Sequence, residues 1–237
     1  MKVIGIIPAR YASSRFPGKP LADILGKSMI QRVYEQCKKA NSLSEVIVAT
    51  DNKQILNHVQ GFGGKAIMTV SSHPSGTDRC NEAIQTTQEQ YDIAINIQGD
   101  EPFINPEQID QVTSLFNSEK VIIATLAKKI EDESLITDRN SPKVIFNENG
   151  IVLNFCRTIA EYSTEEDYFK HIGIYGYRTQ TLAEICELQP SENELKERLE
   201  QLRWLDHNYQ IKVGITTYEG VSIDTPEDIK KIKAQMG

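Results

Sequence analysis

Short apolar runs alternate with amphipathic stretches through the first half of the chain. The apolar runs cover residues 3–7, 46–50, 66–70 and 93–97. Helical patterns follow them over about 28–40, from about 53, from near 77, and from 106 to about 116. Continuous apolar strands between amphipathic helices are typical of βαβ units, in which helices cover both faces of a mostly parallel sheet. We therefore predict an α/β fold with a mostly parallel, mixed sheet flanked by helices.

The second half of the chain has a different pattern. Residues 144–146 and 151–155 flank an Asn-Glu-Asn-Gly turn and predict a β-hairpin, and residues 171–177 predict a further strand. The pattern then predicts one long helix over about 191–207, a strand over 211–217 and a final helix from Thr225. No repeat and no long linker divides the chain. We therefore predict a single domain over 1–237, with a small β-rich elaboration at about 121–180 whose exposed edge can pair in a dimer.

Composition narrows the class of protein. The 237 residues carry a net charge of −7, so the surface as a whole repels nucleic acid and acidic membranes. No apolar run approaches the roughly 20 residues that cross a bilayer, and the N-terminus lacks a signal-peptide pattern. The four cysteines form no C-x-x-C pair, and Cys37 shares an apolar helical stripe with Ile30, Val33 and Tyr34, which predicts a core position. We expect a cytoplasmic protein with neither nucleic-acid binding nor membrane insertion.

The loop after the first predicted strand indicates the chemistry. Residues 10–21 read Arg-Tyr-Ala-Ser-Ser-Arg-Phe-Pro-Gly-Lys-Pro-Leu and carry three cations, Arg10, Arg15 and Lys19. Arginine forks bind phosphate oxygens in pairs, and lysine adds a compact charge. Ligands of open α/β sheets bind at the carboxyl ends of the strands, which is where this loop lies. The loop predicts a polyphosphate site, although it has neither a G-x-G-x-x-G fingerprint nor a G-x-x-x-x-G-K-[ST] motif. A merely solvated basic loop is the alternative.

Two aspartates are candidates for binding a metal ion. Asp100 follows the predicted strand 93–97, and an acid there is costly unless it is paired or metal-bound. Mg²⁺ prefers one or two carboxylates together with phosphate oxygens, although Asp100 could instead cap a turn. Asp224 precedes a Thr-Pro-Glu-Asp sequence that resembles a helix cap, with Thr225 as N-cap and Asp228 completing a capping box. On spacing alone, capping explains that segment.

Further polar candidates have two open interpretations each. The sequence Ser75-Gly76-Thr77-Asp78-Arg79 can start a helix, and it can also present hydroxyl and amide groups to a base. Later in the chain, some polar groups follow the hairpin or alternate along one strand. Others border the buried apolar seam that Leu195, Leu199 and Leu202 would form on the predicted 191–207 helix. These later candidates are Arg157, His171, Tyr175, Tyr177, Glu194 and Gln201. Each of them can line a pocket or be purely structural.

Seven segments, in order from residue 6 to residue 228, resemble one family. They are I-I-P-A-R-Y-A-S-S-R-F-P-G-K-P-L, V-A-T-D, S-G-T-D-R, I-Q-G-D-E-P, H-I-G-I-Y-G-Y, L-E-Q-L-R and D-T-P-E-D. The family is that of the 3-deoxy-manno-octulosonate (Kdo) cytidylyltransferases, also called CMP-Kdo synthetases. The resemblance implies a Rossmann-like nucleotidyltransferase fold and a homodimer. It also implies Mg²⁺-dependent transfer of CMP from CTP to Kdo, with release of pyrophosphate, in the cytoplasmic supply of Kdo for lipopolysaccharide.

The resemblance also implies roles for individual residues. Triphosphate binding would fall to Arg10, Arg15 and Lys19, and catalysis to Lys19, Arg10 and Asp100. Mg²⁺ would be bound by Asp100 and Asp224. The cytidine side would be bordered by Ser75, Gly76, Arg79 and Gln98, and the sugar acid would face Arg157, His171, Tyr175, Glu194 and Gln201.

One segment departs from the family pattern. Members usually have serine before the arginine and an Ile-Pro pair shortly after it, whereas this chain has Cys-Arg-Thr-Ile-Ala over residues 156–160. A cytidylyltransferase for a related sugar acid such as 8-amino-Kdo therefore stays open as an alternative. A second alternative, of a different class, is a non-catalytic nucleotide-binding protein on the same fold. An NAD-dependent oxidoreductase is excluded by the missing glycine fingerprint.

Overall fold

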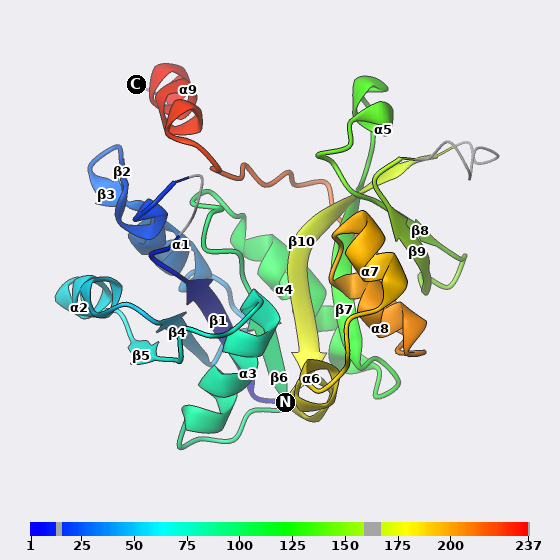
Figure 1. Cartoon of the computed structure of the whole chain (residues 1–237), viewed down its shortest axis with the longest axis horizontal. Helices are drawn as coiled ribbons and strands as arrows, with labels where there is room; N and C mark the ends of the chain where they lie inside the picture. The colour runs from blue at the N-terminus through cyan, green and yellow to red at the C-terminus, as the bar shows by residue number, and fades with distance from the viewer. Residues whose placement is uncertain (13–15, 159–166, 237) are drawn as a thin grey trace. The chain divides into compact units, whose positions relative to one another are not determined.

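The structure, a computed structural model, describes residues 1–12, 16–158 and 167–236 (Figure 1). The chain divides into two compact units, one of Met1–Asp110 with Gly220–Gly237 and the other of Gln111–Glu219. Each is described by itself. The predicted elaboration at about 121–180 falls within the second unit, and the single-domain organisation stays a prediction.

The first unit is built on four parallel strands. β1 (Val3–Ala9) pairs with β4 (Glu45–Thr50) on one side and with β6 (Ile93–Asn96) on the other, and β5 (Ala66–Met68) pairs with β4. β1 and β4 are buried along nearly their whole length, as expected for strands covered on both faces. The predicted mostly parallel sheet is confirmed in this unit.

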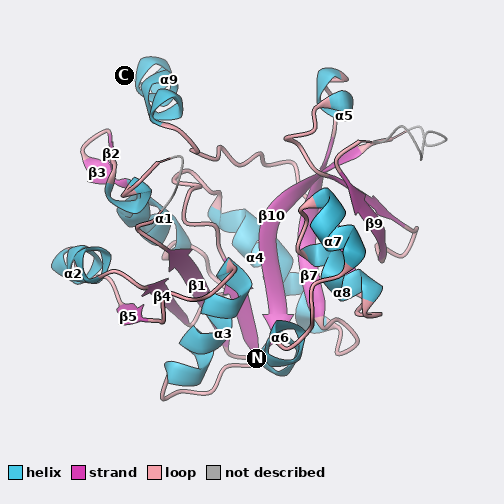
Figure 2. Ribbon diagram, viewed as in Figure 1, coloured by secondary structure: helices cyan, strands magenta, loops and turns pink. Residues whose placement is uncertain are grey.

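Helices of the first unit begin close to where the sequence predicts them. They are α1 (Met29–Cys37), α2 (Lys53–Gly61), α3 (Gly76–Thr86) and α9 (Pro226–Met236), while α4 (Pro106–Ser114) contains the boundary between the units. Both α1 and α3 pack against β1 (Figure 2). Ser28 caps α1 by accepting a hydrogen bond from the Gln31 N–H, and Cys37 is fully buried in the predicted apolar stripe.

The C-terminal segment is anchored to the region that follows β1. Ile223, Ile229 and Ile232 form one apolar cluster with Ile24 and Met29, next to the short strands β2 (Asp23–Ile24) and β3 (Lys27–Ser28). The predicted capping box of α9 is present: the Thr225 N–H donates to Asp228 at 2.9 Å, and the Asp228 N–H donates to the Thr225 hydroxyl at 3.4 Å.

The second unit is a mixed sheet. β7 (Ile123–Lys129) pairs parallel with β11 (Ile211–Ile215) and antiparallel with β10 (Phe169–Arg178), and Figure 2 shows β7 and β10 side by side. The predicted hairpin is confirmed as β8 (Lys143–Phe146) and β9 (Val152–Cys156), with Gly150 at a φ of 65° in its turn. β7, α5 (Ser134–Thr137) and α6 (Thr179–Cys186) are not among the predicted elements.

The predicted long helix over 191–207 is wrong. The segment forms two short helices, α7 (Glu192–Glu197) and α8 (Gln201–Asp206), because Arg198 adopts the left-handed conformation at a φ of 55° and ends α7. The expected buried seam fails at Leu195, which is 67% exposed, although Leu199 and Leu202 are buried. Across the residues that the structure describes, no helix is both long and apolar enough to span a membrane.

Candidate active site

A cavity of about 260 Å³ lies in the first unit, where β1 and β6 end. It brings together eight of the residues predicted for nucleotide and metal binding, namely Arg10, Lys19, Ser75, Gly76, Arg79, Gln98, Asp100 and Asp224. Arg15 lies outside the described residues. The cavity lies at the carboxyl ends of parallel strands, where sheets of this kind bind ligands, and its use for nucleotide binding stays a prediction.

Glycines allow the segments that form the cavity to approach one another. A Cβ at Gly99 would lie 2.8 Å from the carbonyl oxygen of Pro8, which is closer than real Cβ atoms come. A Cβ at Gly76 would lie 3.2 Å from Cγ of Pro8. The loop after β6 can therefore lie this close to the end of β1 only because Gly99 lacks a side chain, and Gly76 eases the similar approach of α3.

Local backbone structure places Lys19 in the cavity. Gly18 adopts a φ of 73° and donates its N–H to the Tyr11 carbonyl at 3.0 Å. A 3-10 turn over Lys19–Leu21 follows directly, with proline near its start. The turn is pre-organised because Gly18 supplies the left-handed residue before it and Pro20 fixes a φ within it.

The ammonium group of Lys19 joins the two predicted metal ligands. Its Nζ donates to Asp100 Oδ2 at 2.9 Å and to the Ile223 carbonyl at 3.0 Å, and it lies 3.4 Å from Asp224 Oδ1. The Ile223 N–H also donates to the Asp100 carbonyl at 2.9 Å, so backbone hydrogen bonding sets the two aspartates side by side. Two carboxylates more than a hundred residues apart in the sequence thus face one cation.

This donor set suits Mg²⁺. Two carboxylates and a backbone carbonyl converge on a single positive centre, and all three are hard oxygen ligands. Among the described residues, no group of three or more His, Cys, Asp or Glu side chains is placed to hold a metal ion. An ion held by Asp100 and Asp224 would therefore complete its coordination with substrate and water oxygens, which is the usual arrangement for Mg²⁺ beside phosphates.

The segment 75–79 starts α3, which confirms the helix-start interpretation of this sequence. The Ser75 hydroxyl accepts a hydrogen bond from the Asp78 N–H at 3.2 Å and so caps α3. Arg79 is only 3% exposed, and its guanidinium binds Asp51 at 3.0 Å, the Val70 carbonyl at 3.3 Å and the Thr69 hydroxyl. Because Ser75, Gly76 and Arg79 also line the cavity, capping and nucleotide binding are compatible here.

Two lining residues lie outside every segment that the sequence singled out. His73 and Pro74 directly precede the S-G-T-D-R segment and line the same cavity. A histidine next to a glycine-containing helix start was the available signal. The His73 ring contacts Glu82 of α3 through Nε2.

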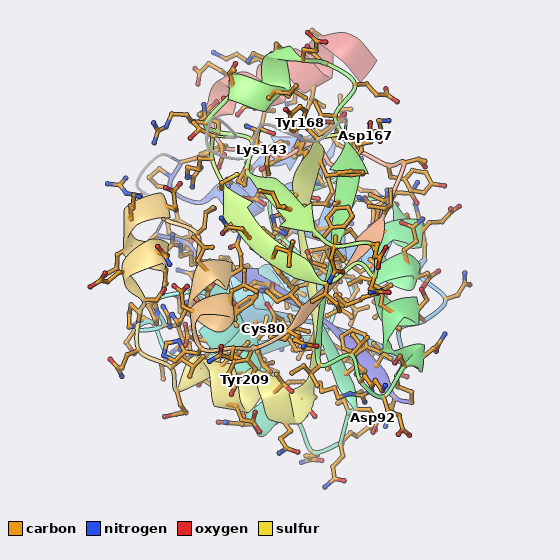
Figure 3. All side chains as sticks on the ribbon, turned by 90° about the vertical axis from the view of Figure 1, so that its right-hand side faces the viewer. Cys80, Asp92, Lys143, Asp167, Tyr168 and Tyr209 are labelled. Carbon is orange, nitrogen blue, oxygen red and sulfur yellow. The ribbon has the colours of Figure 1, made fainter. Side chains whose placement is uncertain are left out.

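Arg157, in the second unit, is committed to backbone groups. Its guanidinium donates to the Glu197 carbonyl at 2.7 Å, the Arg139 carbonyl at 2.9 Å and the Arg198 carbonyl at 3.1 Å. The carbonyl of Arg157 itself accepts from the ammonium of Lys143 at 3.2 Å, and burial lowers the pKa of that lysine. Lys143 is labelled in Figure 3. The arginine thus holds the turn between α7 and α8, whatever else it binds.

His171 and Tyr175 lie in a buried aromatic cluster. The ring centroids of these two residues are 5.2 Å apart, and Tyr175 also packs edge-on against Trp204 at 5.1 Å. His171 Nε2 lies 3.0 Å from the Thr125 hydroxyl, and burial lowers the pKa of His171 to about 3. Burial also raises the pKa of Tyr175. Both groups are therefore neutral at physiological pH, and Tyr177 stacks beside Tyr175 on the same strand face as predicted.

Glu194 and Gln201 occupy different helices, so they do not share the predicted helix border. Both carboxylate oxygens of Glu194 accept hydrogen bonds from Arg203, at 2.6 and 2.7 Å, and Glu194 also completes the capping box of α7 with Ser191. Gln201 is the first residue of α8 and is buried. All five sugar-side candidates belong to the second unit, and their role stays a prediction.

Comparison with known proteins decides the family. A model of the cytidylyltransferase family matches residues 4–214. A Parabacteroides distasonis protein named 3-deoxy-manno-octulosonate cytidylyltransferase is 53% identical over 99% of this chain and 98% of its own length. This chain belongs to the Kdo cytidylyltransferase family.

Further relatives agree with this assignment. A solved structure of CMP:2-keto-3-deoxy-manno-octonic acid synthetase complexed with CTP has a TM-score of 0.94 and 40% identity, covering 100% of this chain and 98% of that one. A Shewanella halifaxensis family member named 8-amino-3,8-dideoxy-manno-octulosonate cytidylyltransferase is 45% identical over 100% of this chain and 99% of its own length. The resemblance found in the sequence, the nucleotidyltransferase class and the Rossmann-like α/β fold are thereby confirmed.

Proposed function

We propose that this chain transfers CMP from CTP to Kdo and releases pyrophosphate. The observation that carries the proposal is the convergence of Lys19, Asp100 and Asp224 in one cavity, in a chain of the Kdo cytidylyltransferase family. A cation beside two carboxylates at the carboxyl ends of parallel strands suits a triphosphate and its metal ion.

The reaction joins two anions, so its main demands are alignment and neutralisation of charge. The anomeric hydroxyl oxygen of Kdo attacks the α-phosphorus of CTP, and the bond from that phosphorus to the bridging oxygen of the β-phosphate breaks. Pyrophosphate leaves with the electron pair, and the hydroxyl proton passes to solvent. Lys19 supplies a point charge beside the phosphates, and Arg10 supplies a planar fork at the rim of the cavity.

Asp100 and Asp224 would hold Mg²⁺, which as a Lewis acid would neutralise phosphate charge and lower the pKa of a bound hydroxyl. The rest of the predicted nucleotide site, Ser75, Gly76, Arg79 and Gln98, would border the cytidine. The sugar acid would be bound by Arg157, His171, Tyr175, Glu194 and Gln201, as the family resemblance implies.

We further propose a cytoplasmic homodimer that supplies activated Kdo for lipopolysaccharide. Leu153 on β9 is 60% exposed, and Leu195 on α7 is 67% exposed, which gives the second unit apolar surface suited to association. Sedimentation velocity of the wild type and of Leu153→Asp would test the dimer, since the added charge should favour the monomer.

Pyrophosphate release from CTP plus Kdo tests the proposed reaction. Activity should require Mg²⁺, should vanish with excess chelator and should return when Mg²⁺ is restored. The same assay with 8-amino-Kdo tests the second candidate substrate, which the 45% identical relative named for that sugar favours. Absence of turnover with every sugar acid, together with tight CTP binding without Mg²⁺, would contradict catalysis and favour a nucleotide-binding protein.

A further inference from the structure

Glu82 lies on α3, outside the residues that line the cavity, yet it holds part of the cavity wall. Its Oε2 accepts a hydrogen bond from the Val70 N–H at 2.9 Å and contacts His73 Nε2. The side chains of His73 and Glu82 are 17% and 27% exposed, so solvent screens the pair only partly.

Hydrogen bonds to α3, more than burial, fix the chain between β5 and α3. The Val70 side chain is 51% exposed and provides little packing. Its N–H is held by Glu82 and its carbonyl by Arg79, at 2.9 and 3.3 Å respectively. Both polar backbone groups of Val70 are therefore bound by side chains of one helix, and His73, three residues later, is bound by the same glutamate.

Glu82 is ionised at neutral pH. Burial alone would raise its pKa, but hydrogen bonds from His73 and the Val70 N–H, and the nearby charge of Arg79, outweigh burial and hold the pKa of Glu82 below its usual range. A carboxylate can only accept hydrogen bonds. The proton of a neutral His73 ring must therefore lie on Nε2, and Nδ1 is then a hydrogen-bond acceptor.

Because His73 lines the cavity, this tautomer offers a hydrogen-bond acceptor to a ligand there. His73 lines the cavity, and within the described residues Nδ1 makes no hydrogen bond. Cytosine carries a 4-amino donor where uracil carries a carbonyl acceptor. An acceptor on the protein can bind the amino group of cytosine. With uracil the same protein acceptor would face a carbonyl, which is also an acceptor, so no hydrogen bond forms. Such mismatches discriminate strongly between ligands.

We propose that Glu82 is a positioning residue that presents Nδ1 of His73 to the 4-amino group of cytosine and thereby selects CTP over UTP. This inference rests on the proposed use of CTP. It assigns a role in base selection to two residues: His73 touches the nucleotide, and Glu82 acts only through His73.

Calorimetric titration of CTP and UTP, with Mg²⁺ present and without sugar acid, tests the proposal. The variants are Glu82→Ala and His73→Ala. The matched control is Glu89→Ala. Glu89 also accepts hydrogen bonds from two side chains, Lys2 and Tyr91, but it does not line the cavity. The ratio of CTP to UTP affinity should fall about tenfold in both test variants, as for loss of one specific hydrogen bond, and should be unchanged in the control.

A spectroscopic signature separates this role from simple support of the fold. Nitrogen-15 shifts of the His73 ring should show the Nε2–H tautomer in the wild type and a mixture in Glu82→Ala. An unchanged CTP to UTP ratio in folded His73→Ala, or an Nδ1–H tautomer in the wild type, would overturn the proposal. His73→Ala alone decides the matter if Glu82→Ala does not fold. Because no turnover is measured, failure of Kdo transfer and failure of base selection are distinguishable.

Discussion

Nζ of Lys19 lies 2.9 Å from Oδ2 of Asp100. The lysine side chain is 15% exposed and the aspartate side chain 27%, so water screens the pair only in part. Asp224, which lies 3.4 Å from the same ammonium, is 41% exposed. The lysine therefore occupies the position in which the two carboxylates would share a metal ion, and lysine and metal must compete for the same oxygens.

Lys19→Met should affect metal binding and catalysis in opposite directions. Without nucleotide, removal of a positive charge next to both carboxylates should tighten divalent metal binding by about tenfold or more. Pyrophosphate release should nevertheless fall by a factor on the order of 100 to 1,000, as for loss of one donor that stabilises developing charge. Binding is measured with Mn²⁺ by electron paramagnetic resonance, and turnover with CTP and Kdo.

Lys27→Met serves as the control for Lys19→Met. It also removes a lysine from an ion pair, here with Glu35, but the pair is exposed and does not line the cavity. Both metal affinity and turnover should stay at the wild-type level. Equal Mn²⁺ affinity in Lys19→Met and the wild type would show that the lysine and the metal do not share the two carboxylates.

Arg79→Met should destabilise the first unit strongly. The substitution leaves Asp51, whose side chain is 14% exposed, without its guanidinium partner. Breaking a buried ion pair by removing one partner costs about 3–5 kcal/mol of unfolding free energy. Urea unfolding measures this loss, and Lys2→Met, which breaks an exposed pair with Glu89, should cost less than about 1 kcal/mol. Comparable losses of unfolding free energy in the two variants would mean that the ion pair of Arg79 with Asp51 adds little to stability.

The sequence was sufficient to predict that Lys19 and Asp100 would line one cavity, because both lie in loops at the carboxyl ends of parallel strands, and their binding of nucleotide stays a prediction. The apolar runs of β1 and β6 identify two strand ends, and Lys19 and Asp100 lie in the segments that follow them. The position of Asp224 was harder to predict, because its place beside Asp100 depends on a backbone hydrogen bond from Ile223 and on packing of Ile229 and Ile232. On spacing alone, only its capping neighbours could be predicted.

The break between α7 and α8 could not be predicted from local pattern. Residues 191–207 have suitable helical periodicity, but Arg198 takes a left-handed conformation. The guanidinium of Arg157, about forty residues earlier in the chain, binds the carbonyls of Glu197 and Arg198 that a continuous helix would use internally. A long-range interaction thus overrides helix propensity at this point.

Arg157→Lys should therefore weaken the second unit although it keeps the charge. Lysine cannot donate to three carbonyls with the fork geometry of arginine. We expect the free energy of unfolding to fall by roughly 1–3 kcal/mol, measured by urea titration. If Arg157 also binds the sugar acid, the KM for Kdo should rise while CTP affinity is unchanged. A variant with wild-type stability would contradict the structural role of these three bonds.

Gly99→Ala should distort the cavity. Its Cβ would lie 2.8 Å from the Pro8 carbonyl oxygen, so the loop after β6 must move away from the end of β1. Overpacking of this kind costs about 1–3 kcal/mol of unfolding free energy, and CTP affinity measured by calorimetry should fall with it. Gly61→Ala, where a Cβ has open space, should leave CTP affinity unchanged. Wild-type CTP binding by Gly99→Ala would contradict the close approach.

His171 should make the stability of the protein depend on pH. Its pKa is lowered to about 3 by burial, below the value near 6.5 of an unfolded histidine. The unfolded chain therefore binds a proton more readily, so this contribution to stability is fully present above about pH 6.5 and is lost progressively as the pH falls toward 3. Between pH 7.5 and pH 5 the wild type should lose about 2 kcal/mol relative to His171→Gln, whose side chain does not titrate. Urea midpoints of both proteins across this pH range measure the difference, and parallel curves would mean that the imidazole is solvated or paired with an acid in the folded state.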